Sequence, residues 1–110
     1  MIEKEIFIYE IESVKDALKK LNKIGCRTLL VVGNENKLLG TITDGDIRRY
    51  ILKGENLENG IKDVYNKKYI SITDKEFSIE KVKQMLLFNK IELIPVVNAN
   101  GCVKDFITWN

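Results

Sequence analysis

The stretch "SVKDALKKLNKIGCRTLLVVGNENKLLGTIT", residues 13–43, decides the fold because its pattern occurs a second time in the chain. Residues 78–108, "SIEKVKQMLLFNKIELIPVVNANGCVKDFIT", align with it without a gap at an offset of 65 (78 − 13). Few residues are identical, but the apolar positions coincide, as do the turn segments "GNEN" and "NANG". We therefore infer a tandem duplication.

Each copy has the pattern of a helix followed by a β-hairpin. Ser13 and Ser78 suit the N-cap position, and in the first copy apolar residues then recur at helical spacing up to Gly25. Two apolar runs of strand length flank a short turn in each copy. Short strands are expected at 6–8 and 69–72, and "DIRRYILKG" predicts a helix that closes the first copy. The predicted class is α/β (α+β), each repeat running strand, helix, strand, strand, helix.

The linker between the copies is predicted at "GENLENG", residues 54–60. We expect a first unit at 1–59 and a second at 60–110, the latter opening with a short helix at "IKDVY". A unit of about 50 residues buries little surface alone, so the two should pack on each other as a pseudo-twofold pair. The sequence ends at "ITWN", where the second closing helix would begin, so we expect a truncated second unit.

Composition narrows the function classes. The 110 residues carry 18 basic and 16 acidic side chains, a net charge of +2, and the two signs are interspersed, so no nucleic-acid partner is expected. The apolar runs are far shorter than the roughly 20 residues that cross a bilayer, and the start lacks a signal-peptide pattern, so we expect no membrane partner and a cytoplasmic location.

Catalysis by the isolated chain is not expected. Histidine is absent, and Cys26 and Cys102 lack the C-x-x-C spacing of a zinc or redox site, so we expect two buried, reduced thiols and no metal. The sequence also contains no phosphate-binding loop of the G-x-G-x-x-G type and no nucleophile beside a base. An enzyme is therefore the least favoured class.

The duplication, the element order and "GTITDGD", residues 40–46, together resemble a cystathionine beta-synthase (CBS) domain pair, the Bateman module. The most specific pieces are the pattern G-h-h-T-x-x-D, in which Thr41 stands where an apolar residue is usual, and "LIPVVNANG" at 93–101. "LLGTITDGDIRRYILKG" and the closing "DFITWN" look like the pairs appended to sugar-phosphate nucleotidyltransferases of the mannose-1-phosphate guanylyltransferase type. A similar "TDGD-[IL]-RR" string occurs in pairs attached to arabinose-5-phosphate isomerases.

The resemblance implies a regulatory module. Such a module would bind an adenosine-type nucleotide or a related small ligand between its repeats, with AMP, ADP, ATP or S-adenosylmethionine as candidates, and would modulate an attached catalytic domain. The expected partners are that domain and a second copy of the chain, because such pairs often form dimers. The alternative is a structural dimerisation element that binds no ligand.

Thr43 ends a predicted strand and Asp46 lies in the first turn of the next helix, so a hydroxyl and a carboxylate could together hold a ribose. Carried over from the family, two sites are implied. The first uses Thr41, Thr43 and Asp46, with Ile72, Ile91 and Glu92 opposite. The second uses Phe106 and Thr108, with Ile8, Cys26 and Arg27 opposite.

Two departures bear on these sites. Glu92 stands where nucleotide-binding members often carry a basic residue, and a carboxylate there would repel a phosphate unless Arg48 or Arg49 compensates. In the second site the aspartate of T-x-x-D would follow Asn110, although Arg27 is well placed for an anion. The residues also permit a purely structural reading of "TDGD", in which Thr43 ends a strand and the aspartates serve the helix start.

Overall fold

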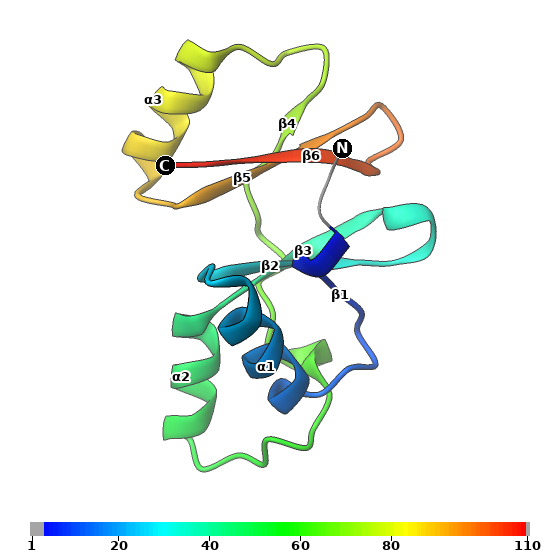
Figure 1. The fold of residues 1–110 in the computed structure, drawn as a ribbon, viewed down its shortest axis with the longest axis vertical. Helices are drawn as coiled ribbons and strands as arrows, with labels where there is room; N and C mark the ends of the chain where they lie inside the picture. Colours follow the sequence, from blue (N-terminus) through cyan, green and yellow to red (C-terminus); the bar gives the residue numbers. More distant parts are fainter. Residues whose placement is uncertain (1–3, 110) are drawn as a thin grey trace.

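The two repeats fold as two similar units, one above the other (Figure 1). The computed structural model describes residues 4–109. The first unit contains β1 (Phe7–Ile8), α1 (Val14–Ile24), β2 (Thr28–Val32), β3 (Leu38–Thr43) and α2 (Asp44–Leu52). The second contains β4 (Ile72–Thr73), α3 (Ile79–Asn89), β5 (Leu93–Val97) and β6 (Val103–Thr108). Short 3-10 helices occupy Lys4–Ile6, Asn34–Asn36 and Ile61–Asp63. The predicted mixed α/β fold of tandem repeats is confirmed.

Both units build the same three-stranded sheet. The strand orders are β1-β2-β3 and β4-β5-β6, each with one parallel and one antiparallel pair. The registers also match across the offset, since Leu29 pairs with Ile42 and Ile94 pairs with Ile107. Lys37 and Cys102, which are again 65 residues apart, form a β-bridge with each other. Two equivalent residues can pair in this way only near the pseudo-twofold axis.

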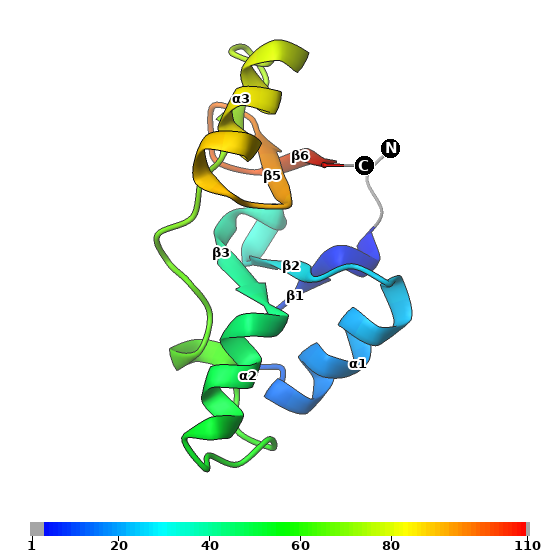
Figure 2. The ribbon, with the colours of Figure 1, turned by 90° about the vertical axis from the view of Figure 1, so that its left-hand side faces the viewer.

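The layers run from helix to sheet to sheet to helices (Figure 2). One apolar cluster lies between α1, α2 and the first sheet, a second between the two sheets, and a third between the second sheet and α3. Along β2, Leu29 and Val31 belong to the first cluster, and Leu30 and Val32 to the second. Both faces of this sheet are therefore covered, which explains why "TLLVV" is buried throughout.

Helices α1 and α3 have equivalent ends. Ser13 and Ser78 cap the first turns, each accepting a hydrogen bond from the third helical backbone amide. Gly25 ends α1 in the left-handed conformation, with φ 66°. Its equivalent at the end of α3 is Lys90, with φ 54°. This conformation costs a residue with a side chain roughly 1–2 kcal/mol, so Lys90 is a strained position.

The segment after the predicted linker packs into the first unit. Ile61 and Tyr65 are buried in the cluster beneath the first sheet. The Tyr65 hydroxyl donates a hydrogen bond of 2.5 Å to the Glu10 carboxylate. Gly40 allows the Tyr65 ring and the Asn66 carbonyl to lie close to β3, because a β-carbon at Gly40 would overlap both. The boundary between 59 and 60 stays a prediction.

Two further expectations can be placed. Cys26 and Cys102 are free thiols, but each is half-buried, because both lie next to a strand end and not within the core. The truncation of the second unit before its last helix stays a prediction. Over residues 4–109, no helix is both long and apolar enough to span a bilayer.

Candidate functional site

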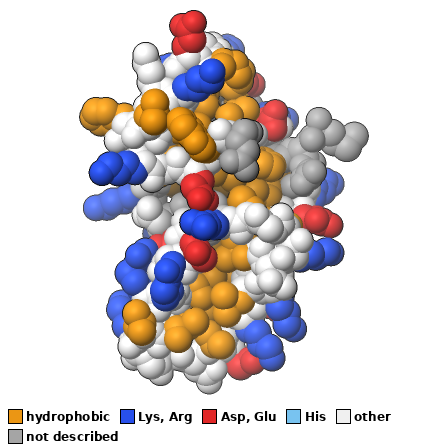
Figure 3. All heavy atoms as spheres, turned by 60° about the vertical axis from the view of Figure 1, so that its left-hand side comes forward, with side chains coloured by type: hydrophobic (Ala, Val, Ile, Leu, Met, Phe, Trp, Pro, Cys, Tyr) orange, Lys and Arg blue, Asp and Glu red, His pale blue; other side chains and the backbone are white. Residues whose placement is uncertain are grey.

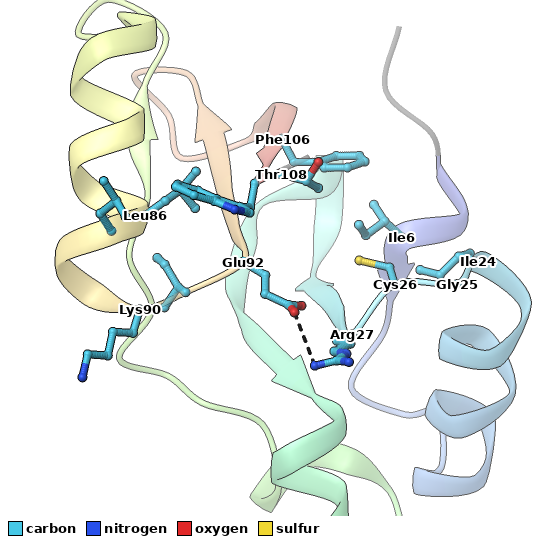
Figure 4. Close-up of a pocket in the computed structure, with 13 residues that line it drawn as sticks. Ile6, Ile24, Gly25, Cys26, Arg27, Leu86, Lys90, Glu92, Phe106 and Thr108 are labelled. Atoms are coloured by element: carbon cyan, nitrogen blue, oxygen red, sulfur yellow. Dashed lines mark ion pairs between the residues drawn. The ribbon is translucent and has the colours of Figure 1, made fainter.

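A cavity of about 710 Å³ lies between the two units (Figure 4). This volume is within the range of small-molecule binding sites. The lining side chains come from both repeats and are mostly apolar or aromatic, with a few polar and charged groups. They are Ile6, Ile24, Gly25, Cys26, Arg27, Leu86, Leu87, Lys90, Ile91, Glu92, Phe106, Thr108 and Trp109.

The core of this lining is one short stretch taken from each repeat. Residues 25–27 lead from the end of α1 into β2, and residues 90–92 lead from the end of α3 into β5. The two stretches are equivalent under the offset of 65. The cavity therefore borders the carboxyl ends of both helices.

Arg27 and Glu92 form an ion pair across this cavity, as the dashed line in Figure 4 marks. The Arg27 Nη1 lies 3.7 Å from the Glu92 Oε1, and the side chains are 73% and 52% exposed. Exposed pairs of this kind contribute roughly 0–1 kcal/mol to stability. The pair therefore matters more for the charge of the cavity than for holding the units together.

The rest of the wall suits a flat, weakly polar ligand. Phe106 and Trp109 contribute aromatic surface, and Ile6 and Leu86 contribute aliphatic surface. Polar atoms are supplied by the Thr108 hydroxyl and the Cys26 thiol, which Figure 4 shows directed toward the space between the units. A mostly apolar wall with a few fixed polar groups is typical of sites for small organic ligands.

The structure gathers residues from both predicted sites into this one cavity. Six residues that were predicted as binding residues line it: Cys26, Arg27, Ile91, Glu92, Phe106 and Thr108. Five do not: Ile8, Thr41, Thr43, Asp46 and Ile72. Ligand binding by any of the eleven stays a prediction.

Thr43 and Asp46 are engaged with each other at the start of α2. The Asp46 backbone amide donates to the Thr43 Oγ1 (3.1 Å), and the Thr43 amide donates to the Asp46 Oδ2 (2.9 Å). The other Asp46 oxygen accepts a hydrogen bond of 2.7 Å from Arg49. Ser13 and Asp16 make the same reciprocal pair at the start of α1. In the structure, Thr43 and Asp46 therefore form a capping box at the start of α2, as the structural interpretation of "TDGD" predicts.

The three remaining predicted residues have structural surroundings. Ile8, in β1, is fully buried in the cluster between the first sheet and its helices. Ile72, in β4, is 3% exposed and belongs to the cluster between the second sheet and α3. Thr41 exchanges two backbone hydrogen bonds with Asn66, at 3.0 and 2.8 Å. Its equivalent Phe106 pairs with Pro95 of β5 and lines the cavity.

Several lining residues were not predicted. They are Ile6, Ile24, Gly25, Leu86, Leu87, Lys90 and Trp109. The repeat offset contained a signal for two of them, since Gly25 and Lys90 flank the predicted Cys26 and Ile91 at equivalent positions. Among residues 4–109, no group of three potential metal ligands occurs.

Residues 1–53 match the family model described as the CBS domain. This stretch is a CBS domain. Among curated proteins, the chain is 36% identical over 104 residues to homoserine O-acetyltransferase of Methanococcus vannielii, covering 92% of the chain and 20% of the relative. It is 30% identical over 89 residues to arabinose 5-phosphate isomerase GutQ of Salmonella typhimurium, covering 81% of the chain and 27% of the relative. The chain thus spans roughly a quarter or less of these relatives.

Solved structures extend the fold match to both units. AcuB from Vibrio cholerae superposes with a TM-score of 0.85 at 19% identity, covering 93% of this chain and 75% of that one. The CBS domain protein PAE2072 from Pyrobaculum aerophilum, complexed with AMP, superposes with a TM-score of 0.81 at 15% identity. The match covers 93% of this chain and 78% of that one. The CBS domain pair of MJ0100, in complex with 5′-methylthioadenosine and S-adenosyl-L-methionine, superposes with a TM-score of 0.80 at 22% sequence identity. The match covers 93% of this chain and 79% of that one. The described residues, 4–109, have the fold of a CBS pair.

Proposed function

We propose that this CBS pair is a regulatory module that binds an adenosine-type ligand in the cavity between its units. The observation that carries the proposal is the composition of the cavity wall, to which both repeats contribute equivalent stretches, 25–27 and 90–92. Its volume of about 710 Å³ suits a nucleoside or nucleotide. Phe106 and Trp109 offer aromatic surface for a base, and Thr108 offers a hydroxyl.

Structures of the same fold support this ligand class. The complexes of PAE2072 and MJ0100 contain AMP, 5′-methylthioadenosine and S-adenosyl-L-methionine. All of these are adenosine derivatives, and they differ in the group attached to the ribose. An adenosine-type ligand is therefore our proposal for this chain, with AMP, ADP, ATP and S-adenosylmethionine among the candidates.

Occupancy would be transmitted through the relative position of the units. A ligand that touches both 25–27 and 90–92 favours whichever arrangement of the units gives the better contacts. An attached domain that also distinguishes the two arrangements would then be coupled to the ligand. Residues 25–27 and 90–92 lead directly into β2 and β5, so the shift would reach the two sheets through them.

The attached domain is also a proposal. We propose a sugar-phosphate nucleotidyltransferase, on the resemblance of residues 38–54 and 105–110 to the pairs appended to such enzymes. The relatives described above are an acetyltransferase and a sugar-phosphate isomerase, each much longer than this chain. The coding sequence on either side of residues 1–110 tests this assignment.

A dimerisation function is the second candidate, and one observation favours it. On α3, Leu87 and Phe88 are 63% and 87% exposed. Figure 3 shows hydrophobic side chains gathered on this face over the second unit, with acidic and basic side chains at the waist between the units. Sedimentation of the chain over a range of concentrations tests for self-association, and a Phe88→Lys variant should weaken it.

The fluorescence of Trp109 can report ligand binding in the cavity. Trp109 is the only tryptophan of the chain and lines the cavity, so ligand binding there should change its fluorescence. Calorimetric titration with AMP, ADP, ATP, GTP and S-adenosylmethionine should find saturable binding, and the same ligand should change the Trp109 emission. Silence of every ligand in both measurements, with a stable dimer, would instead support the structural alternative.

The thiols of Cys26 and Cys102 allow a matched test of where the ligand binds. Cys26 lines the cavity and Cys102 does not, although both are half-buried free cysteines. A bound ligand should slow alkylation of Cys26 by N-ethylmaleimide and leave the rate at Cys102 unchanged. Equal protection of both thiols would indicate general stabilisation of the fold, and not occupancy of the cavity.

A further inference from the structure

Two of the three charged side chains that line the cavity, Arg27 and Glu92, offset each other. Arg27 and Glu92 pair with each other at 3.7 Å. The third charged lining residue is Lys90, and Figure 4 shows its amine directed away from that pair. A phosphate placed beside Arg27 would therefore meet a cation that is already engaged by a carboxylate.

The groups next to Arg27 are also neutralised. The Arg27 carbonyl accepts a hydrogen bond of 3.1 Å from the Asp44 amide, which brings the amino end of α2 close to the cavity. The first turn of α2 already carries two carboxylates, Asp44 and Asp46, paired with Arg48 at 3.6 Å and Arg49 at 2.7 Å. The favourable end of this helix dipole is thus occupied by the chain's own anions.

The other two helices present their unfavourable ends. Both α1 and α3 end at the cavity, at Gly25 and Lys90, and the carboxyl end of a helix carries partial negative charge. Such ends favour cations or uncharged groups and disfavour anions. These helix ends and the Glu92 carboxylate oppose a doubly charged phosphate beside Arg27.

From these observations we infer that the cavity selects adenosine derivatives without a phosphate, and that Glu92 is the specificity-determining residue. This inference rests on the proposed function and adds the ligand class to it. An uncharged nucleoside such as 5′-methylthioadenosine keeps the apolar contacts and leaves the Arg27–Glu92 pair intact. A nucleotide must displace Glu92 from Arg27 and accept a carboxylate as a neighbour.

Calorimetry with 5′-methylthioadenosine and AMP tests the inference at low ionic strength. The natural chain should bind 5′-methylthioadenosine about tenfold or more tightly than AMP. Glu92→Gln removes the repulsion and frees Arg27, so AMP affinity should rise about tenfold while 5′-methylthioadenosine affinity changes less than about twofold. The gain should shrink at about 0.5 M salt, because exposed charges are screened.

Two further variants serve as controls. Glu58→Gln makes the same change of net charge at an exposed ion pair with Lys15, outside the cavity lining, and should alter neither affinity. Arg27→Gln leaves Glu92 unpaired and should weaken AMP further, with 5′-methylthioadenosine again within about twofold.

These measurements distinguish a failure of the selectivity inference from a failure of the proposed function. If both ligands bind but Glu92→Gln leaves their affinity ratio unchanged, or if the natural chain prefers AMP, the inference is wrong and the proposed function stands. If no adenosine derivative binds to the natural chain or to Glu92→Gln, the proposed function fails and this inference fails with it.

Discussion

Arg27 and Glu92 hold equivalent positions in the two repeats, 65 residues apart, and pair with each other at 3.7 Å across the cavity. The β-bridge between Lys37 and Cys102 relates another equivalent pair in the same way. The pseudo-twofold axis therefore passes close to both contacts. The duplication thus placed two copies of one position face to face, and opposite charges at that position make the contact attractive.

This ion pair should contribute little to the stability of the fold. A double-mutant cycle with Arg27→Gln and Glu92→Gln, followed by urea unfolding, should give a coupling free energy below about 1 kcal/mol, because both side chains are largely exposed. A coupling of several kcal/mol would show that the pair holds the units together, and would remove the basis for treating it as a selectivity element.

Lys90→Gly should stabilise the protein. Its backbone is left-handed, with φ 54°, and glycine adopts this conformation without the cost of roughly 1–2 kcal/mol that a side chain incurs. We expect the free energy of unfolding to rise by about 1 kcal/mol. The matched control is Lys83→Gly in the exposed middle of α3, which should lower it by about 1 kcal/mol. Two changes of the same sign would contradict the assignment of Lys90 as the helix cap.

Gly40→Ala should destabilise the first unit. The added β-carbon would overlap the Tyr65 ring and the backbone carbonyl of Asn66, so the segment that carries both must move. Overpacking of this kind costs typically about 1–3 kcal/mol. Gly45→Ala is the control, because its β-carbon would meet Arg49 at 3.5 Å, an ordinary contact. Equal unfolding midpoints for the two variants would mean that Tyr65 does not pack closely on this strand.

Stability at alkaline pH should depend on Tyr65. Burial, together with the hydrogen bond to Glu10 and its charge, raises the pKa of Tyr65 from 10.0 to about 12. The folded protein therefore keeps this proton at pH values where the unfolded chain has released it. The stabilising contribution is complete below pH 10 and is lost as the pH rises toward 12, by at most about 1.4 kcal/mol per pH unit.

Urea unfolding between pH 9 and 12 measures this effect when Tyr65→Phe is the reference. The natural protein should lose more stability than the variant over that range, because lysine titration is common to both. Parallel curves for the two proteins would show that the Tyr65 hydroxyl titrates normally.

Much of this fold could be predicted because the duplication constrains it. The helix from Val14 to Ile24, both hairpins and the pairing of the two units follow from apolar spacing and from the match at an offset of 65. The segment 61–65 was harder to place, because only tertiary packing shows that Ile61 and Tyr65 fill the core of the first unit.

The site could be predicted only in part. The family motif directs attention to Thr43 and Asp46, yet a capping box and a ribose clamp use the same residues at the same spacing. No pattern in the sequence indicates which of the two a hydroxyl and a carboxylate will form. The cavity instead depends on where the helices end, and that becomes visible once Gly25 and Lys90 are placed on either side of the axis.

An amide NMR titration of the chain with 5′-methylthioadenosine tests the central claim most directly. We predict saturable shifts concentrated at residues 25–27 and 90–92 and at Phe106, Thr108 and Trp109, including the single indole signal. Shifts confined to residues 41–46, or no shifts at millimolar ligand, would contradict a ligand site between the two units.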